Sequence, residues 1–81
     1  MKKIRELVEA ICEEVKDAGK YATKAIAYKT EDKQLADMYL NLARQELDHA
    51  DMEHNQVVRA INESRASGKE VPETMMAIWD W

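Results

Sequence analysis

Three side chains in this sequence have the types and spacing of a metal site. Glu46 and His49 are three positions apart, so in a helix they lie on one face. Glu14 stands in an earlier segment that also favours helix. Carboxylate oxygens together with an imidazole nitrogen suit iron or manganese. The sequence therefore predicts a carboxylate–histidine metal site, provided that the fold brings Glu14 to the other two residues.

The composition indicates that helices position these residues. The chain has 81 residues, contains one Pro, two Gly and no Phe, and is rich in helix-forming Ala, Glu, Leu, Met, Lys and Arg. Alternating β-branched and polar residues, which indicate strands, are missing. We predict an all-α fold in a single small domain, residues 1–81.

Two long helices are predicted, one from about residue 2 to 28 and one from about 31 to 66. In the first, apolar residues recur every three or four positions, and the second contains neither Gly nor Pro. Thr30 is the expected N-cap of the second helix. Gly19 costs about 1 kcal/mol relative to Ala inside a helix, and we interpret it as room for the close approach of another helix.

A short third helix completes the predicted architecture. Ser67 and Gly68 end the second helix, with Gly68 in the left-handed conformation. Pro72 suits the first turn of a helix over about residues 72–81. The expected chain is an antiparallel helical hairpin followed by the start of this third helix.

The hairpin brings the three candidate ligands to the same height. With the turn centred near Glu31, Glu14 lies seventeen residues before it, and Glu46 and His49 lie fifteen and eighteen residues after it. All three continue apolar stripes, where an ionised carboxylate is costly unless it is paired, hydrogen-bonded or bound to metal. The stripe position and the matching height together predict one shared site.

The second helix carries more apolar surface than a single partner helix can cover. Two hairpins packed together would cover it as a four-helix bundle, so we predict a homodimer or a higher homo-oligomer. Such a dimer would offer four Glu and two His. The apolar residues of the second helix follow two adjacent lines, Leu35, Tyr39 and Leu42 on one, and Leu40, Ala43, Leu47, Ala50, Val57, Val58 and Ile61 on the other.

Two segments resemble a known superfamily. "EVKDAGKY" (residues 14–21) has a Glu followed seven positions later by a Tyr, and "LARQELDHA" (residues 42–50) carries Glu-x-x-His-Ala about thirty residues on. This pattern resembles the rubrerythrin-type half-repeat of the ferritin-like superfamily over roughly residues 7–61. A chain with one such half is similar to the encapsulated ferritins, two-helix proteins whose dimers rebuild the bundle and its di-iron site.

The resemblance implies a ligand set and a chemistry. Glu14 and His49 would hold each iron terminally, Glu46 would bridge the two ions, and Tyr21 would hydrogen-bond a ligand carboxylate. The implied function is that of a non-haem di-iron protein oxidising Fe(II) (ferroxidase-like), with one iron per chain at the dimer interface and manganese as the alternative metal. Cys12 is the only cysteine, so a four-cysteine rubredoxin module is excluded. An encapsulin-type shell is a further implied partner, although no targeting tail follows the third helix.

Other residues of the charged segment keep more than one interpretation. Glu53 continues the ligand line and is either a solvated glutamate or an accessory ligand. His54 falls on another line, as an interface or surface residue, and Asp48 and Asp51 are expected to face solvent. We expect Cys12 to be a small core residue. The alternative functions are a metal-free helical assembly or partner-binding module, and a fragment of a longer ferritin-like protein.

Charge and hydropathy restrict the partners and the compartment. The formal net charge is −4 and the basic residues are scattered, which argues against nucleic-acid binding. No apolar run approaches the ~20 residues of a membrane span, and the polar start does not suit a signal peptide. A single cysteine and no export signal favour the cytoplasm.

Overall fold

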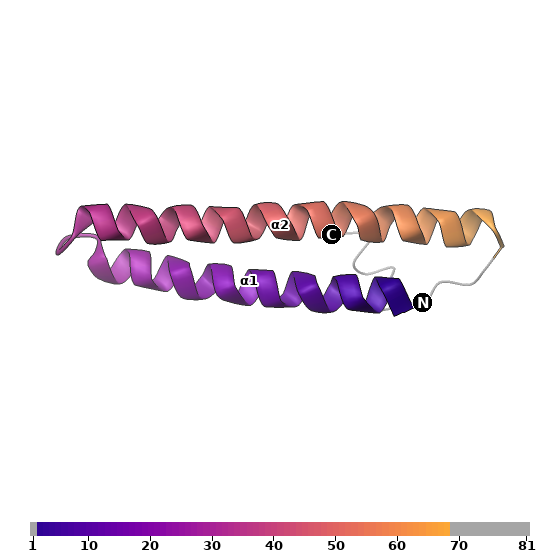
Figure 1. Ribbon diagram of the computed structural model, residues 1–81, viewed down its shortest axis with the longest axis horizontal. Helices are drawn as coiled ribbons and strands as arrows, with labels where there is room; N and C mark the ends of the chain where they lie inside the picture. The colour runs from indigo at the N-terminus through magenta and orange to yellow at the C-terminus, as the bar shows by residue number, and fades with distance from the viewer. Residues whose placement is uncertain (1, 69–81) are drawn as a thin grey trace.

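Two long antiparallel helices lie side by side in the computed structural model, which describes residues 2–68 (Figure 1). Helix α1 spans Lys2–Tyr28 and α2 spans Lys33–Ala66, and no strand occurs within the described range. The predicted all-α class is therefore confirmed. The predicted third helix, about residues 72–81, lies outside the described residues.

The start of α2 differs from the prediction. Asp32, not Thr30, is the N-cap, because its side chain accepts a hydrogen bond from the backbone N–H of Leu35 at 3.1 Å. The backbone N–H of Asp32 in turn donates to the carbonyl of Tyr28 at 2.9 Å, which closes the turn against the end of α1. Thr30 lies exposed within the turn, and α2 begins at Lys33 rather than at residue 31.

The end of α2 follows the prediction. Gly68 has φ +78°, the left-handed conformation that glycine adopts without steric cost. Its N–H donates to the carbonyl of Arg65 at 3.1 Å, and the N–H of Ser67 donates to that of Glu63 at the same distance. These bonds satisfy carbonyl groups that the last helical turn would otherwise leave unpaired.

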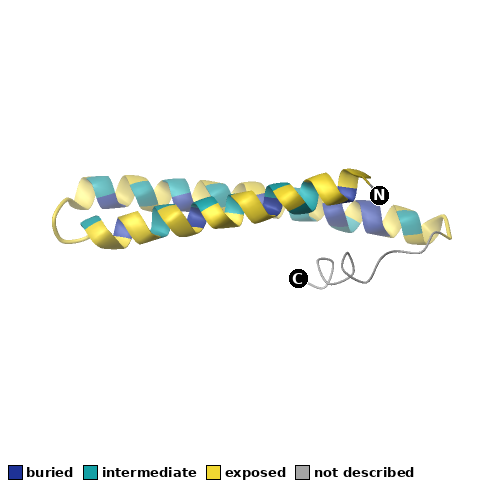
Figure 2. Ribbon diagram, turned by 90° about the horizontal axis from the view of Figure 1, so that it is seen from below, coloured by how far each residue is buried: buried dark blue, intermediate teal, exposed yellow. Residues whose placement is uncertain are grey.

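The two helices meet along a seam in which a small or branched residue recurs every seven positions. This spacing keeps one stripe of each helix facing the other, as in a coiled coil. Alanine at most of these positions allows the backbones to approach closely. Figure 2 shows the buried positions lying between the helices. The seam consists of Ile4, Ile11, Ala18 and Ala25 in α1, and of Ala36, Ala43, Ala50 and Val57 in α2.

The two ends of the hairpin are stabilised differently. Away from the turn, Ile4, Ile11, Val57 and Ile61 form an apolar core cluster. Towards the turn the seam contains only alanine, and a stack of aromatic rings lies beside it. The ring of Tyr39 stacks on those of Tyr21 and Tyr28 at centroid distances of 6.3 and 6.1 Å. Each such pair contributes about 0.5–1.5 kcal/mol beyond its buried area.

Apolar side chains also remain on the outside of the hairpin. Val15, Ile26, Leu40 and Leu47 are between 39% and 75% exposed. Each of the four residues follows a seam residue by one or four positions. This spacing places all of them on the same side of the seam. A single hairpin thus leaves apolar surface uncovered, as the excess of apolar residues in the second helix predicted.

Gly19 and Cys12 do not have the predicted roles within the hairpin. Each directly follows a seam residue, so it is rotated about 100° away from the opposite helix. Gly19 is exposed, and an added Cβ would meet nothing within 4 Å, so Gly19 does not make room for α2. Room for a helix of a second molecule stays a prediction. Cys12 is exposed as well and is not a core residue of the hairpin.

Replacement of Asp32 by Ala should lower the free energy of unfolding by about 0.5–2 kcal/mol, because the N–H of Leu35 loses its acceptor. Chemical denaturation monitored by circular dichroism measures this loss. Thr30→Ala is the control and should have little effect. If both variants lost the same amount of stability, neither Asp32 nor Thr30 alone would be the N-cap of α2.

Replacement of Gly19 by Ala should raise the stability of the isolated hairpin by about 0.5–1 kcal/mol, because the exposed helix gains propensity without a clash. The thermal unfolding midpoint reports the change. Ala27→Gly, at another exposed position of α1, should produce a loss of similar size. Destabilisation by Gly19→Ala would contradict the open surroundings of this residue.

Candidate metal centre

The heptad spacing places the candidate ligands in facing rows. Tyr21 of α1 stacks on Tyr39 of α2, which fixes how the helices align beside the seam. Glu14 lies seven residues before Tyr21 and Glu46 lies seven residues after Tyr39. Because the helices are antiparallel, both steps lead away from the turn by the same distance. The two glutamates therefore occupy the next row after the stacked rings.

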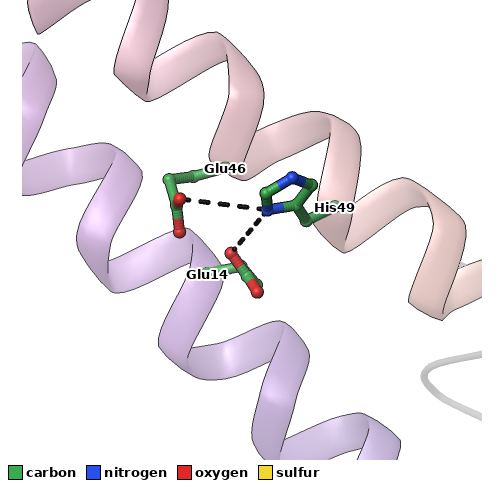
Figure 3. Close-up of side chains that lie close together, drawn as sticks. All are labelled: Glu14, Glu46 and His49. Carbon is green, nitrogen blue, oxygen red and sulfur yellow. Dashed lines mark ion pairs between the residues drawn. The ribbon is translucent and has the colours of Figure 1, made fainter.

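His49, which belongs to α2, lies close to both carboxylates. Its Nδ1 atom lies 3.4 Å from Oε2 of Glu14 and 3.9 Å from Oε1 of Glu46. Figure 3 shows the three side chains pointing toward one another, with Glu14 coming from one helix and the other two from the second. One ligand atom from each residue falls within 4.8 Å of the others. The predicted convergence of these residues is thus present in the fold.

Glu14 affects the ionisation of Glu46. The pKa of Glu46 is raised above its ordinary value, first because its side chain shares a hydrogen bond with Glu14, and then by burial and by the negative charge of Glu14. His49 opposes the shift, and Asp17 adds to it. A proton held between the carboxylates offsets their repulsion, and a bound cation would do so more effectively.

The group is sheltered on the side of the carboxylates and open on the side of the imidazole. The side chains of Glu14 and Glu46 are 23% and 22% exposed, whereas that of His49 is 50% exposed. The site therefore lies on a long face of the hairpin rather than inside it. A second molecule packed on this face could reach any cation held by the three residues.

The distances suit a transition-metal ion after small side-chain movements. Bonds of ~2.0–2.2 Å from a metal to oxygen or nitrogen allow ligand atoms to be up to ~4.4 Å apart. The group within 4.8 Å exceeds this limit only slightly, and rotation of the carboxylates can close the difference. Three ligands from one hairpin would leave coordination positions free for further ligands, water or substrate.

Glu53 is not a freely solvated side chain. Its Oε1 atom is buried and has no hydrogen-bond partner. Burial is the main cause that raises the pKa of Glu53, and the charge of Glu14 raises it further, whereas His49 opposes the shift. The sequence left this residue open between solvation and an accessory role, and its burial beside the site favours the latter.

Tyr21 is packed against another ring rather than against the carboxylates. Its contact is the stack with Tyr39, and no hydrogen bond joins its hydroxyl to Glu14 or Glu46 in the described part of the chain. The expected hydrogen bond to a ligand carboxylate therefore stays a prediction. Asp48 is exposed, as predicted.

Asp51 and His54 of α2 lie outside the candidate metal centre. Asp51 is exposed, as predicted, and His54 is half-buried. Neither belongs to the group of three converging side chains.

Sequence reasoning did not single out Asp17. It is half-buried and contributes negative charge at Glu46. Asp17 lies three residues after Glu14, the same spacing that separates Glu46 from His49. That spacing was the available signal, because it places Asp17 beside Glu14 on the same face of α1.

Comparison with known proteins adds no relative. No protein-family model, curated protein or solved structure matches the chain. Neither described helix contains a stretch long and apolar enough to cross a membrane. The geometry of the site therefore carries the functional argument.

Glu46 should make the metal-free protein less stable as the pH rises. Its folded pKa lies above the ordinary 4.5, so the folded state holds its proton to higher pH than the unfolded chain. The resulting stability is fully present below about pH 4.5 and is lost as the pH rises through the folded pKa. Urea unfolding with a chelator, between pH 4 and 7, should show wild type losing stability relative to Glu46→Gln.

Asp48→Asn removes the same charge at an exposed position of α2 and serves as the control. Its stability profile should run parallel to that of wild type. Parallel profiles for wild type and Glu46→Gln would instead show that Glu46 is not held in a proton-sharing pair.

Proposed function

We propose that this protein is a non-haem di-iron carboxylate protein of ferritin-like type, in which two hairpins together bind the metal ions. The observation that supports it most is the convergence of Glu14, Glu46 and His49 from two helices. The buried seam is formed by other residues, and Glu14, Glu46 and His49 add two partly buried carboxylates and an exposed imidazole beside it. The cost of placing them there is offset if a cation binds.

The composition of the ligand set favours a second copy as the other half of the site. A hairpin offers two carboxylates and one imidazole, and its site is open on the His49 side. Two copies related by a twofold axis would provide a Glu from each of two helices and Glu-x-x-His from each of the other two, the set typical of di-iron bundles.

Each side chain would then have a distinct role. Glu14 and His49 would bind one ion terminally, and Glu46 would share its oxygens between two ions. The bound iron would supply ferroxidase-like chemistry, the oxidation of Fe(II) by O₂ or peroxide, and manganese is the alternative metal.

A metal-free assembly module is the second candidate function. It is supported by the contacts of His49, whose Nδ1 atom lies close enough to both glutamates to form ion pairs without a cation. The exposed Val15, Ile26, Leu40 and Leu47 also offer an apolar surface to a partner. In this case the carboxylates and histidine would only stabilise the hairpin or an interface.

Anaerobic titration with Fe(II) distinguishes the two functions. We expect saturation near one iron per chain, and a shift in thermal unfolding, since a ligand at 100 times its Kd stabilises the state that binds it by ~2.7 kcal/mol. Glu46→Ala combined with His49→Ala should abolish both effects. Sedimentation with and without metal should show whether the binding species is a dimer or larger.

Asp48→Ala combined with His54→Ala is the matched control, because it removes one acid and one histidine from the same helix outside the site. This pair should bind iron as wild type does. Unchanged binding in the Glu46 and His49 variant would eliminate the metal centre and leave the assembly module.

A further inference from the structure

Only one nitrogen of the His49 ring faces the carboxylates. Nδ1 lies next to Glu14 and Glu46, and Figure 3 shows Nε2 on the other side of the ring. A neutral imidazole that binds metal through Nδ1 carries its proton on Nε2. Histidine ligands almost always donate that proton to an acceptor, which fixes the tautomer and the ring orientation. No hydrogen bond occupies Nε2 in the described chain.

Glu53 lacks a hydrogen-bond donor, just as Nε2 of His49 lacks an acceptor. It follows His49 by four residues in α2, a spacing at which helical side chains are neighbours. Its Oε1 atom is buried and lacks a donor, the one such side-chain atom in the part of the chain that the structure describes. A buried acceptor without a partner destabilises the folded chain, so such atoms often mark a role in binding.

We propose that Glu53 is a positioning residue for His49, accepting the Nε2 proton when Nδ1 binds a metal ion. This inference rests on the proposed function and adds to it the acceptor that the metal centre needs. The hydrogen bond is not made in the hairpin as described, where Nδ1 is directed at Glu14. We expect it to form as the ring exchanges its ion pairs for the cation.

The electrostatic contributions at Glu53 oppose one another. Burial and the charge of Glu14 raise the pKa of Glu53, whereas His49 is the group that lowers it. His49 thus favours the charged, hydrogen-bond-accepting form of Glu53. An ionised Glu53 would in turn make the imidazole a more basic ligand.

Two substitutions at Glu53 distinguish the effect of its hydrogen-bond acceptor from the effects of its charge and of its packing. Glu53→Gln keeps a carbonyl acceptor without the charge, and Glu53→Leu removes the acceptor but retains the bulk. The probe is Zn(II), which is diamagnetic and permits ¹⁵N NMR of the His49 ring. Asp51→Asn, at an exposed position of the same helix, is the control for the lost charge.

We expect wild type, Asp51→Asn and Glu53→Gln to bind Zn(II) through Nδ1, each with a protonated Nε2 that exchanges slowly. Glu53→Leu should bind ~10–100-fold more weakly, the usual effect of losing such an acceptor. Its Nε2 proton should exchange rapidly with water. The metal-free Glu53→Leu protein should nevertheless unfold at a higher temperature than wild type, because a buried carboxylate oxygen without a donor is gone.

The outcomes distinguish the inference from the function on which it rests. If wild type does not bind Zn(II) or Fe(II), both are overturned. If wild type binds and Glu53→Leu binds equally well with the same ring signals, only the positioning role is overturned. If Glu53→Gln loses as much affinity as Glu53→Leu, Glu53 is a direct ligand instead. A lower unfolding temperature for metal-free Glu53→Leu would indicate a purely structural contact.

Discussion

The close seam between α1 and α2 is the constraint on which the rest of the molecule depends. Alanine at Ala18, Ala43 and Ala50 keeps the two backbones near enough for carboxylates on facing rows to meet. Larger residues there would separate the helices, and the short reach of a glutamate would no longer span the distance. The same repeat of seven also fixes the alignment along the hairpin. Packing and site geometry therefore come from one set of residues.

The site is the place where the hairpin departs from what is best for its stability alone. A row that carries tyrosine or leucine elsewhere carries Glu14, Glu46 and Glu53 in its middle, and the charge of Glu14 helps to raise the pKa of Glu46 and of Glu53. His49 offsets part of this repulsion from the open side. Local conflicts of this kind are common where a fold is adapted to bind something. Within residues 2–68 they are confined to about two helical turns.

Much of this arrangement could be predicted from the sequence because it follows from periodicity. The two helices, the left-handed Gly68 and the meeting of Glu14 with Glu46 and His49 need only helix geometry and a turn position. Asp32 could not be chosen over Thr30 in this way, since both are good caps and two residues apart. The exposure of Cys12 and Gly19 depends on which residues of the stripe face the opposite helix, and a wide apolar stripe does not determine this. The burial of the Glu53 Oε1 atom without a hydrogen-bond donor depends on its neighbours in three dimensions, which the sequence does not reveal.

Spacing by sevens also limits how the length of this chain could change. One residue inserted between the turn and Glu14 would rotate that carboxylate by about 100° and shift it by about 1.5 Å, away from Glu46 and His49. A seven-residue insertion in only one helix would restore the rotation but leave the ligands about 10 Å apart along the axis. Seven residues added to both helices would preserve the site and move it farther from the turn. A hairpin of different length that keeps these three residues together therefore requires heptads added in pairs.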